Sequence, residues 1–179
     1  GMKIDFIDVK RAYFHADCKR DVYIQLPAED GEEGKCGKLV KSMYGTRDAA
    51  QNWEEEYCRF LSGLGFHKGL ASPCAFLHPH RNIELVVHGD DFTILGTDGD
   101  LQWLSAKFAE KFKIKVRGIL GPDNRDDKEI SLLNRAISWT ASGITYEADQ
   151  RHSELLLKLL GYENAKGAIT PGTHDIESK

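Results

Sequence analysis

The chain has 179 residues, of which 41% are hydrophobic and 29% are charged, and its formal net charge is -4 at pH 7. These values are typical of a folded globular protein and exclude a wholly disordered chain. They also exclude a strongly basic nucleic-acid-binding protein, so any contact with nucleic acid must use local basic patches. No apolar run reaches the roughly 18 residues that a membrane helix needs. Four cysteines without zinc-ligand spacing favour a reduced, intracellular protein.

The first third of the chain predicts a strand, a hairpin and a helix. Residues 3 to 8 form an apolar run typical of a strand, and a loop or helical turn follows. Residues 22 to 26 alternate as a strand that stops at a proline, and a second short strand near residues 38 to 40 completes a hairpin across an acidic loop. Asp48 is the expected N-cap of a helix to about Leu64, because apolar residues then recur with helical spacing.

The middle of the chain predicts three strands, a second helix and a fourth strand. The strands lie at residues 74 to 77, 83 to 87 and 92 to 95, and a helix beginning near residues 98 to 100 leads into a strand at 112 to 116. Apart from the hairpin and the strand at residues 74 to 77, the order is strand, helix, strand, strand, helix, strand. This order predicts an α+β fold of the split βαβ (ferredoxin-like) type, an antiparallel sheet backed by two helices.

A Gly/Pro/Asp-rich break from Gly118 to Asp127 divides the chain into two predicted domains, residues 2–118 and 119–179. The second domain is expected to be a small β-hairpin and helix lobe. Its strands lie near 129 to 139 and 144 to 147, and its helix runs from about Asp149 to Leu160. The tail that follows is expected to be weakly ordered.

Three aspartates carry the strongest chemical signal. Asp8 ends the first strand, and Asp90 and Asp91 lie in a tight turn between two apolar, β-rich runs. Strand ends can place carboxylates side by side, where their charges repel unless divalent cations neutralise them. Three carboxylates are enough for two Mg²⁺ ions about 3.5–4 Å apart, which can catalyse an in-line phosphoryl displacement. The alternative on spacing alone is an ordinary Asp-rich surface turn.

Two weaker features have simpler explanations. His78 and His80 flank a proline and could bind a metal, although histidines in a hairpin loop more commonly face solvent. Basic residues gather in patches that a solvated charged face explains equally well. These residues are Lys10, Arg11, Lys19, Arg20, Lys35, Lys38, Lys41, Arg47, Lys107, Lys111, Lys113, Lys115 and Arg117.

Several motifs in order carry a family resemblance. They are Asp8-Val9-Lys10-Arg11-Ala12-Tyr13-Phe14-His15, then Lys41-Ser42-Met43-Tyr44-Gly45 followed by Trp53, then His88-Gly89-Asp90-Asp91. Shorter matches follow the same order at Gly65-Phe66, Phe112-Lys113-Ile114-Lys115 and Thr170-Pro171-Gly172. The chain resembles the palm of a copia-type retrotransposon reverse transcriptase, an RNA-directed DNA polymerase. The second domain then corresponds to a connection- or thumb-like lobe.

The resemblance implies a role for each motif. Asp8, Asp90 and Asp91 are the expected catalytic residues and ligands of Mg²⁺, with Mn²⁺ as an alternative, and Tyr13 is expected to be a steric gate against the 2′-hydroxyl of a ribonucleotide. The alternative for Tyr13 is an ordinary core aromatic. The expected substrate-binding residues are Val9, whose carbonyl could also bind metal, Lys10, Arg11, Ala12, Tyr13, Gly45, Arg47 and Gln51.

The resemblance also implies partners and a cellular setting. The partners are an RNA or DNA template-primer, a deoxynucleoside triphosphate and the remainder of a Pol polyprotein with its fingers and RNase H regions, but no membrane. The setting is the cytoplasm, in a virus-like particle, or the nucleus, for an element whose DNA integrates.

The sequence departs from the family pattern in three places. His88 stands where an aromatic residue is usual, the segment before Trp53 lacks the usual Gln, Pro and Arg, and the chain begins almost at the first catalytic strand, without the fingers region. We therefore expect either a fragment of a longer polyprotein or a catalytically inactive palm remnant that binds nucleic acid or has a structural role. A nucleotide cyclase on the same type of sheet is a third hypothesis.

Overall fold

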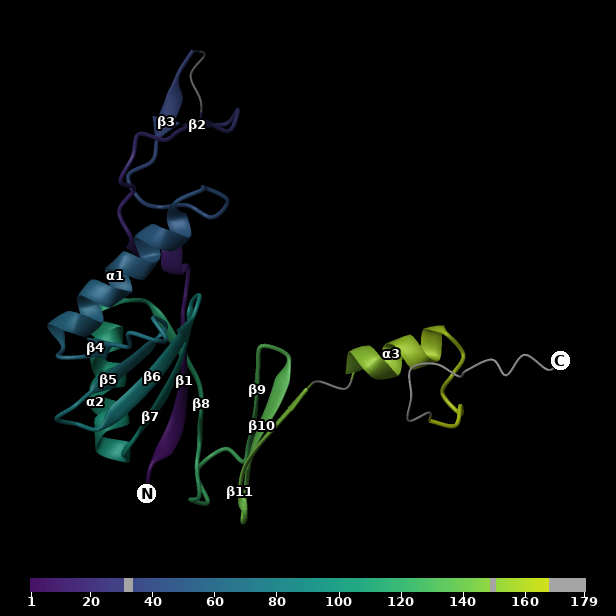
Figure 1. Ribbon diagram of the computed structural model, residues 1–179. Coiled ribbons are helices and arrows are strands. Elements are labelled where there is room, and N and C mark those ends of the chain that lie inside the picture. Colours follow the sequence, from purple (N-terminus) through teal and green to yellow (C-terminus); the bar gives the residue numbers. More distant parts are fainter. Residues whose placement is uncertain (31–33, 149–150, 168–179) are drawn as a thin grey trace.

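The computed structural model of the chain describes residues 1–30, 34–148 and 151–167. Its centre is a six-stranded antiparallel sheet in the order β4-β5-β6-β7-β1-β8 (Figure 1). The strands are β1 (Lys3–Val9), β4 (His67–Lys68), β5 (Ala75–His78), β6 (Ile83–His88), β7 (Asp91–Gly96) and β8 (Ile114–Leu120). The predicted strands of this region are confirmed, whereas the two-residue strand β4 was not predicted.

Two helices cover one face of this sheet. In α1 (Ala49–Gly63) the buried residues Trp53, Tyr57 and Leu61 recur every four positions, and they pack with aromatic residues of the sheet. α2 (Asp98–Lys111) begins after Thr97, whose hydroxyl accepts a hydrogen bond from the backbone N–H of Asp100. Such a cap satisfies one of the free N–H groups at a helix start. The prediction of an α+β fold with an antiparallel sheet backed by two helices is confirmed.

β1 is buried on both faces of the sheet. Ile7 and Val9 belong to the core beneath the helices, whereas Phe6 packs with Leu120 and Ile137 on the opposite face. Because side chains alternate along a strand, Asp8 points to the same face as Phe6, away from the helices. This alternation sets the face on which the acidic residues can meet.

A short hairpin extends from the end of the sheet where α1 begins (Figure 1). It consists of β2 (Tyr23–Gln25) and β3 (Cys36–Lys38), and it confirms the predicted hairpin, although its second strand begins before Lys38. Between β1 and this hairpin lies the 3-10 helix η1 (Ala12–His15), where a helical turn was expected.

A second, three-stranded antiparallel sheet packs against β1 and β8 through Ile137. Its strands are β9 (Glu129–Leu132), β10 (Arg135–Thr140) and β11 (Gly143–Ala148). The predicted two-stranded hairpin is therefore wrong, because a turn divides the apolar run 129 to 139. Leu133 and Asn134 both have positive φ, as a two-residue type I′ turn requires, and a leucine there gives no turn signal.

Two boundaries differ from the prediction. β8 continues through Gly118, where a break was expected, and the side chains of Asp127 and Ile130 approach this position closely enough that an added Cβ would require them to shift. α3 (Arg151–Leu159) lies where a helix was predicted, but the predicted start at Asp149 is outside the described residues, as is Thr170-Pro171-Gly172. The division into two domains stays a prediction.

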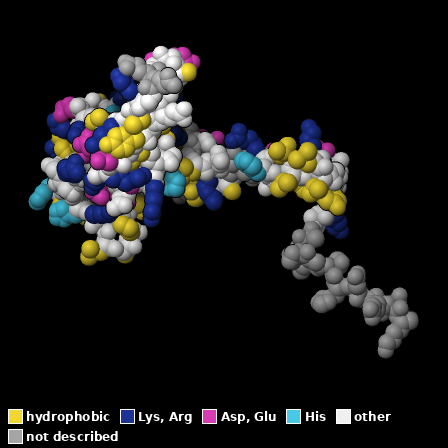
Figure 2. Space-filling model, turned by 90° about the horizontal axis from the view of Figure 1, so that it is seen from above, with side chains coloured by type: hydrophobic (Ala, Val, Ile, Leu, Met, Phe, Trp, Pro, Cys, Tyr) yellow, Lys and Arg dark blue, Asp and Glu magenta, His cyan; other side chains and the backbone are white. Residues whose placement is uncertain are grey.

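α3 has no buried residue, and Figure 2 shows hydrophobic side chains gathered on its surface. These include Leu155, Leu156 and Leu159. The described part of the chain holds no helix with both the length and the apolar character needed to cross a membrane.

Candidate metal centre

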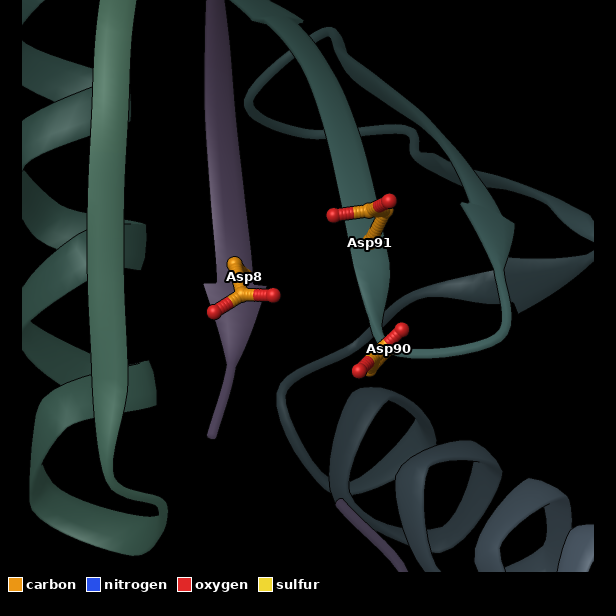
Figure 3. Close-up of side chains that lie close together, drawn as sticks. All are labelled: Asp8, Asp90 and Asp91. Atoms are coloured by element: carbon orange, nitrogen blue, oxygen red, sulfur yellow. The ribbon is translucent and has the colours of Figure 1, made fainter. Parts of the chain in front are cut away.

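Asp8, Asp90 and Asp91 converge at one end of the central sheet. Asp8 lies directly opposite Asp91 in the register of β1 with β7, and Asp90 precedes β7 (Figure 3). Each residue offers a carboxylate oxygen, and these three oxygens lie within 4.8 Å of one another. All three residues are half-buried. The three aspartates are called the acidic triad below.

A two-residue turn places Asp90 and Asp91. β6 ends at His88, which pairs with Asp91, so that Gly89 and Asp90 are the two turn residues. Gly89 has a φ of 64°, and a type II′ turn needs such a positive φ at its first central residue. Gly89 therefore has a local structural role in presenting Asp90 to the face of Asp8.

Two hydrogen bonds fix this turn to the rest of the fold. The backbone N–H of Val9 donates to the carbonyl of Asp90 at 2.9 Å, and Nε1 of Trp53 donates to the carbonyl of Gly89 at 2.8 Å. Trp53 is 1% exposed and contacts Tyr57, Phe92 and Phe112 edge-on. The sequence around Trp53 gives no indication of this hydrogen bond to the turn.

Arg117 brings a positive charge to the acidic triad. Its Nη2 lies 2.9 Å from Oδ1 of Asp91 and 3.4 Å from Oδ1 of Asp8. Burial raises the pKa of Asp91, the guanidinium of Arg117 opposes that rise, and the carboxylates of Asp90 and Asp8 add to it. Three carboxylates that face one guanidinium leave excess negative charge, and hard oxygen ligands of this kind fit Mg²⁺ or Mn²⁺.

The sequence reading missed Arg117 as a member of this site and counted it in a basic surface patch. Arg117 lies on β8, which pairs with β1, and Lys115 of the same strand lies opposite Asp8. The register shifts between Ile7, which faces Val116, and Phe6, which faces Gly118. Arg117 is thus the extra residue of a β-bulge, a feature that re-aims side chains and is hard to infer from sequence.

The residues after Asp8 lie at the same end of the sheet. Val9 and Ala12 are fully buried, whereas Lys10 and Arg11 are exposed, and Arg11 has a left-handed φ of 55°. Tyr13 is half-buried and stacks on Tyr44 with ring centroids 4.3 Å apart and an interplanar angle of 30°. It also lines a cavity of about 180 Å³ together with Ala50, Trp53, Glu54, Tyr57 and Gly89.

The three remaining predicted substrate residues lie around the start of α1. Gly45 and Arg47 are exposed in the turn before the helix, and Gly45 has a φ of 85°. Gln51 is exposed, and its amide donates to Glu55 within α1. In the part of the chain that the structure describes, neither Arg47 nor Gln51 forms a hydrogen bond or ion pair with the acidic triad.

Asp48 occupies the predicted N-cap position, but its side chain makes no capping hydrogen bond. Its carboxylate accepts hydrogen bonds from Arg20 at 2.9 Å and from Asn52 at 3.2 Å. These contacts hold the pKa of Asp48 below its usual range, with the Arg20 hydrogen bond as the main cause.

Most of the basic patches are neutralised by acidic neighbours. Ion pairs join Lys19 to Glu55, Arg20 to Asp48, Lys38 to Asp21, Lys41 to Asp17, Lys107 to Glu110 and Lys111 to Glu56. Among the described residues, Lys10, Arg11 and Lys115 have no ion-pair partner and lie near the acidic triad in sequence or register. These three residues therefore carry positive charge that no acidic side chain among the described residues neutralises.

His78 is not the solvent-facing residue that was expected. It is 7% exposed, and its ring contacts Phe66 and Trp103 edge-on. Across residues 1–30, 34–148 and 151–167, the acidic triad is the one group of three or more candidate metal ligands that converge.

Comparison with known proteins identifies the family to which the chain belongs. A model of the family "Reverse transcriptase (RNA-dependent DNA polymerase)" matches residues 1–122. The Retrovirus-related Pol polyprotein from transposon TNT 1-94 of Nicotiana tabacum is 26% identical over 178 residues, which is 95% of this chain and 13% of the relative. The Transposon Ty1-GR3 Gag-Pol polyprotein of Saccharomyces cerevisiae is 31% identical over 135 residues, which is 74% of this chain and 8% of the relative.

The chain thus spans only a small part of the length of these relatives. Its family match covers β1 through β8, the region that carries the acidic triad. The resemblance to copia-type retrotransposon reverse transcriptases is confirmed, and the chain belongs to the reverse transcriptase (RNA-dependent DNA polymerase) family, as a reverse transcriptase region of retrotransposon Pol type.

Proposed function

We propose that the chain is the palm of an RNA-directed DNA polymerase and that the acidic triad is its two-metal catalytic centre. The observation that carries the proposal is the convergence of three carboxylates within 4.8 Å in a chain of the reverse transcriptase family. The element order β1, α1, β6, β7, α2, β8, with both helices on one face, supports a split βαβ palm. The proposed palm is residues 2–118 and the proposed connection- or thumb-like lobe is residues 119–179, a boundary that lies within β8.

The reaction is transfer of a nucleotide from a deoxynucleoside triphosphate to the 3′-hydroxyl of a primer, with release of pyrophosphate. Mg²⁺ or Mn²⁺ bound at the triad would activate the attacking hydroxyl and stabilise charge on the leaving phosphate. Asp8 and Asp91 hold their carboxylates on paired strands, so their separation is fixed by the sheet. Trp53 and the backbone of Val9 hold the turn that carries Asp90.

Substrate binding involves the end of β1, the loop that follows it, the turn before α1 and the first turn of α1. The proposed contacts are Val9, Lys10, Arg11, Ala12, Tyr13, Gly45, Arg47 and Gln51. Exposed Lys10 and Arg11 can meet phosphates, and the Tyr13 ring, braced against Tyr44, can exclude a 2′-hydroxyl from the sugar site. The partners of the reaction are an RNA or DNA template-primer and the remainder of a Pol polyprotein.

The test is primer extension on an RNA template with Mg²⁺ or Mn²⁺, comparing the natural sequence with Asp90→Asn. Asp30→Asn is the matched control, because Asp30 is an exposed aspartate on the acidic loop. We expect synthesis that depends on Asp90 and not on Asp30. If neither this chain nor a longer Pol segment that includes the upstream region shows Asp90-dependent synthesis, the proposal is wrong.

Calorimetry of metal binding provides a second test that is independent of turnover. Mg²⁺ should bind saturably to the natural sequence and to Asp30→Asn, and the signal should be lost in Asp90→Asn. A chain that binds no Mg²⁺ at millimolar concentration would contradict a two-metal centre.

A further inference from the structure

Arg117 makes two of its contacts with the carboxylates that would hold a metal. Its guanidinium pairs with Asp91 at 2.9 Å and with Asp8 at 3.4 Å. Within the described residues Asp90 has no ion-pair partner, so the positive charge is concentrated between the other two members of the triad. The β-bulge in β8 leaves Arg117 without a paired residue on β1, and this irregularity directs its side chain to the acids.

We infer that Arg117 is an internal cation of the acidic triad, whose guanidinium occupies the space between Asp8 and Asp91 until a divalent cation displaces it. This inference rests on the proposed function, since it requires that the triad binds metal. It assigns to Arg117 a role in setting metal affinity, as a positioning residue and not as a group that touches the reacting atoms.

Charge explains why a cation is needed in the metal-free protein. Three carboxylates within 4.8 Å repel one another, and half-burial reduces the screening by water. A guanidinium that contacts two of them offsets part of this repulsion. Without Arg117, the metal-free triad would have to relieve its repulsion by binding protons or by moving its side chains apart.

Competition follows from the atoms that Arg117 uses. It contacts Oδ1 of Asp8 and Oδ1 of Asp91, and these carboxylates are two of the three that would hold a divalent cation. A guanidinium and a divalent cation repel each other, so both cannot take these oxygens at contact distance. A metal that binds through these two oxygens would therefore break one or both ion pairs, which would lower its apparent affinity.

A polar groove next to the triad can accept the displaced side chain of Arg117. The side chain of Arg117 is 35% exposed, and it lines an open, polar groove of about 420 Å³ between β8 and β9. Asp127 and Glu129 line the same groove and offer carboxylates as new partners.

The test is Mn²⁺ binding to the 179-residue chain, measured by calorimetry and by electron paramagnetic resonance of free Mn²⁺. Arg117→Gln should bind Mn²⁺ about tenfold more tightly than the natural sequence, a change on the scale of two partly exposed ion pairs. Arg117→Lys, which keeps the charge, should remain within about threefold of the natural sequence. Lys115→Gln is the matched control, because it removes a charge from the same strand without removing an ion pair to the triad, and it should change the affinity by about twofold or less.

Stability supplies a readout that does not depend on binding enthalpy. Metal-free Arg117→Gln should unfold at lower temperature than the natural sequence, and saturating Mn²⁺ should raise its Tm by more. In the natural sequence, the side-chain Nε–Hε resonance of Arg117 should shift when Mg²⁺ is added, and this shift should vanish in Asp90→Asn. The NMR measurement needs no Arg117 variant, so it tests whether metal displaces Arg117 even if Arg117→Gln does not fold.

The outcomes separate this inference from the proposed function. The role of Arg117 would be overturned if Arg117→Gln bound Mn²⁺ no more tightly than the natural sequence. It would also be overturned if the Arg117 resonance did not shift while the protein bound Mg²⁺. Either result would leave the metal centre intact. If neither the natural sequence nor Arg117→Gln shows Asp90-dependent binding, the metal centre itself is wrong. Asp90-dependent Mn²⁺ binding that is detected in Arg117→Gln but not in the natural sequence would support both the metal centre and the role of Arg117.

Discussion

Asp5 lies at a position that should make the stability of the fold depend on pH. It is the third residue of β1, between Ile94 of β7 and Ile119 of β8, and it is 2% exposed. Its Oδ1 has no hydrogen-bond partner within the described residues. Burial raises the pKa of this carboxyl from 3.8 to about 6, although a hydrogen bond from the backbone of Phe6 opposes the rise. Asp5→Asn replaces it with an uncharged side chain of the same shape.

The direction and size of the effect follow from this pKa. The raised pKa means that the folded state favours the protonated acid, so no penalty exists below the unfolded pKa of 3.8, and the penalty is complete above pH 6. Each pH unit by which the pKa moves corresponds to about 1.4 kcal/mol, which gives a full penalty of about 3 kcal/mol. At pH 5 roughly half of this penalty is present.

Urea unfolding at pH 5 and pH 8 measures the prediction. Asp5→Asn should be more stable than the natural sequence by about 3 kcal/mol at pH 8 and by about half of that at pH 5. Asp30→Asn controls for the loss of a carboxylate from an exposed position, and its stability difference should stay within about 0.5 kcal/mol at both pH values. An Asp5→Asn protein that gains nothing at pH 8, or gains equally at both pH values, would refute the reasoning.

Three further predictions concern the turn and the loop around the triad. Trp53→Phe removes the donor to the Gly89 carbonyl and leaves a small cavity, so urea unfolding should show a loss of about 2 to 3 kcal/mol, and a loss below 0.5 kcal/mol would show that the bond is dispensable. In Gly89→Ala no atom lies within 4 Å of the added Cβ, so backbone strain at the positive φ is the only expected cost. The free energy of unfolding should fall by about 1 kcal/mol in the same assay, and a fall of about 4 kcal/mol would contradict this assignment. Tyr13→Ala should raise incorporation of ribonucleotides relative to deoxyribonucleotides at least about tenfold in primer extension, since it removes the ring that stacks on Tyr44, and an unchanged ratio would remove Tyr13 from the role of gate.

The parts of the fold that periodicity describes well were predictable. Trp53, Tyr57 and Leu61 in α1 and the alternating residues of β6 and β7 give strong local patterns, and these elements lie within a few residues of their predicted bounds. The β9–β10 turn was not predictable, because Leu133 adopts a positive φ that its residue type disfavours. Gly118 was misread as a break because a glycine needed for close packing looks the same in sequence as a glycine in a loop.

The candidate site was predictable in its acids and not in its cation. Asp8, Asp90 and Asp91 each follow or precede an apolar run, so their place at strand ends could be read from local pattern, and the register brings them together. Arg117 depends on a shift of one residue in the pairing of β1 with β8, which no local pattern reports. The Trp53 bond to Gly89 likewise joins residues 36 positions apart, and sequence reasoning has no means to detect it.

The position of β1 between β7 and β8 has a consequence for how the site forms. Asp90 and Asp91 belong to a hairpin of adjacent strands, which needs contacts between residues close in sequence. Asp8 joins them only when β1 pairs with β7 across a separation of 83 residues, a contact whose loop-closure entropy is paid late in folding. During synthesis the triad therefore cannot exist before β7 has been made, and β1 remains open on one edge until β8 follows. A metal ion that binds the triad would stabilise only chains in which β1 has already paired with β7, and so would favour completion of this long-range pairing.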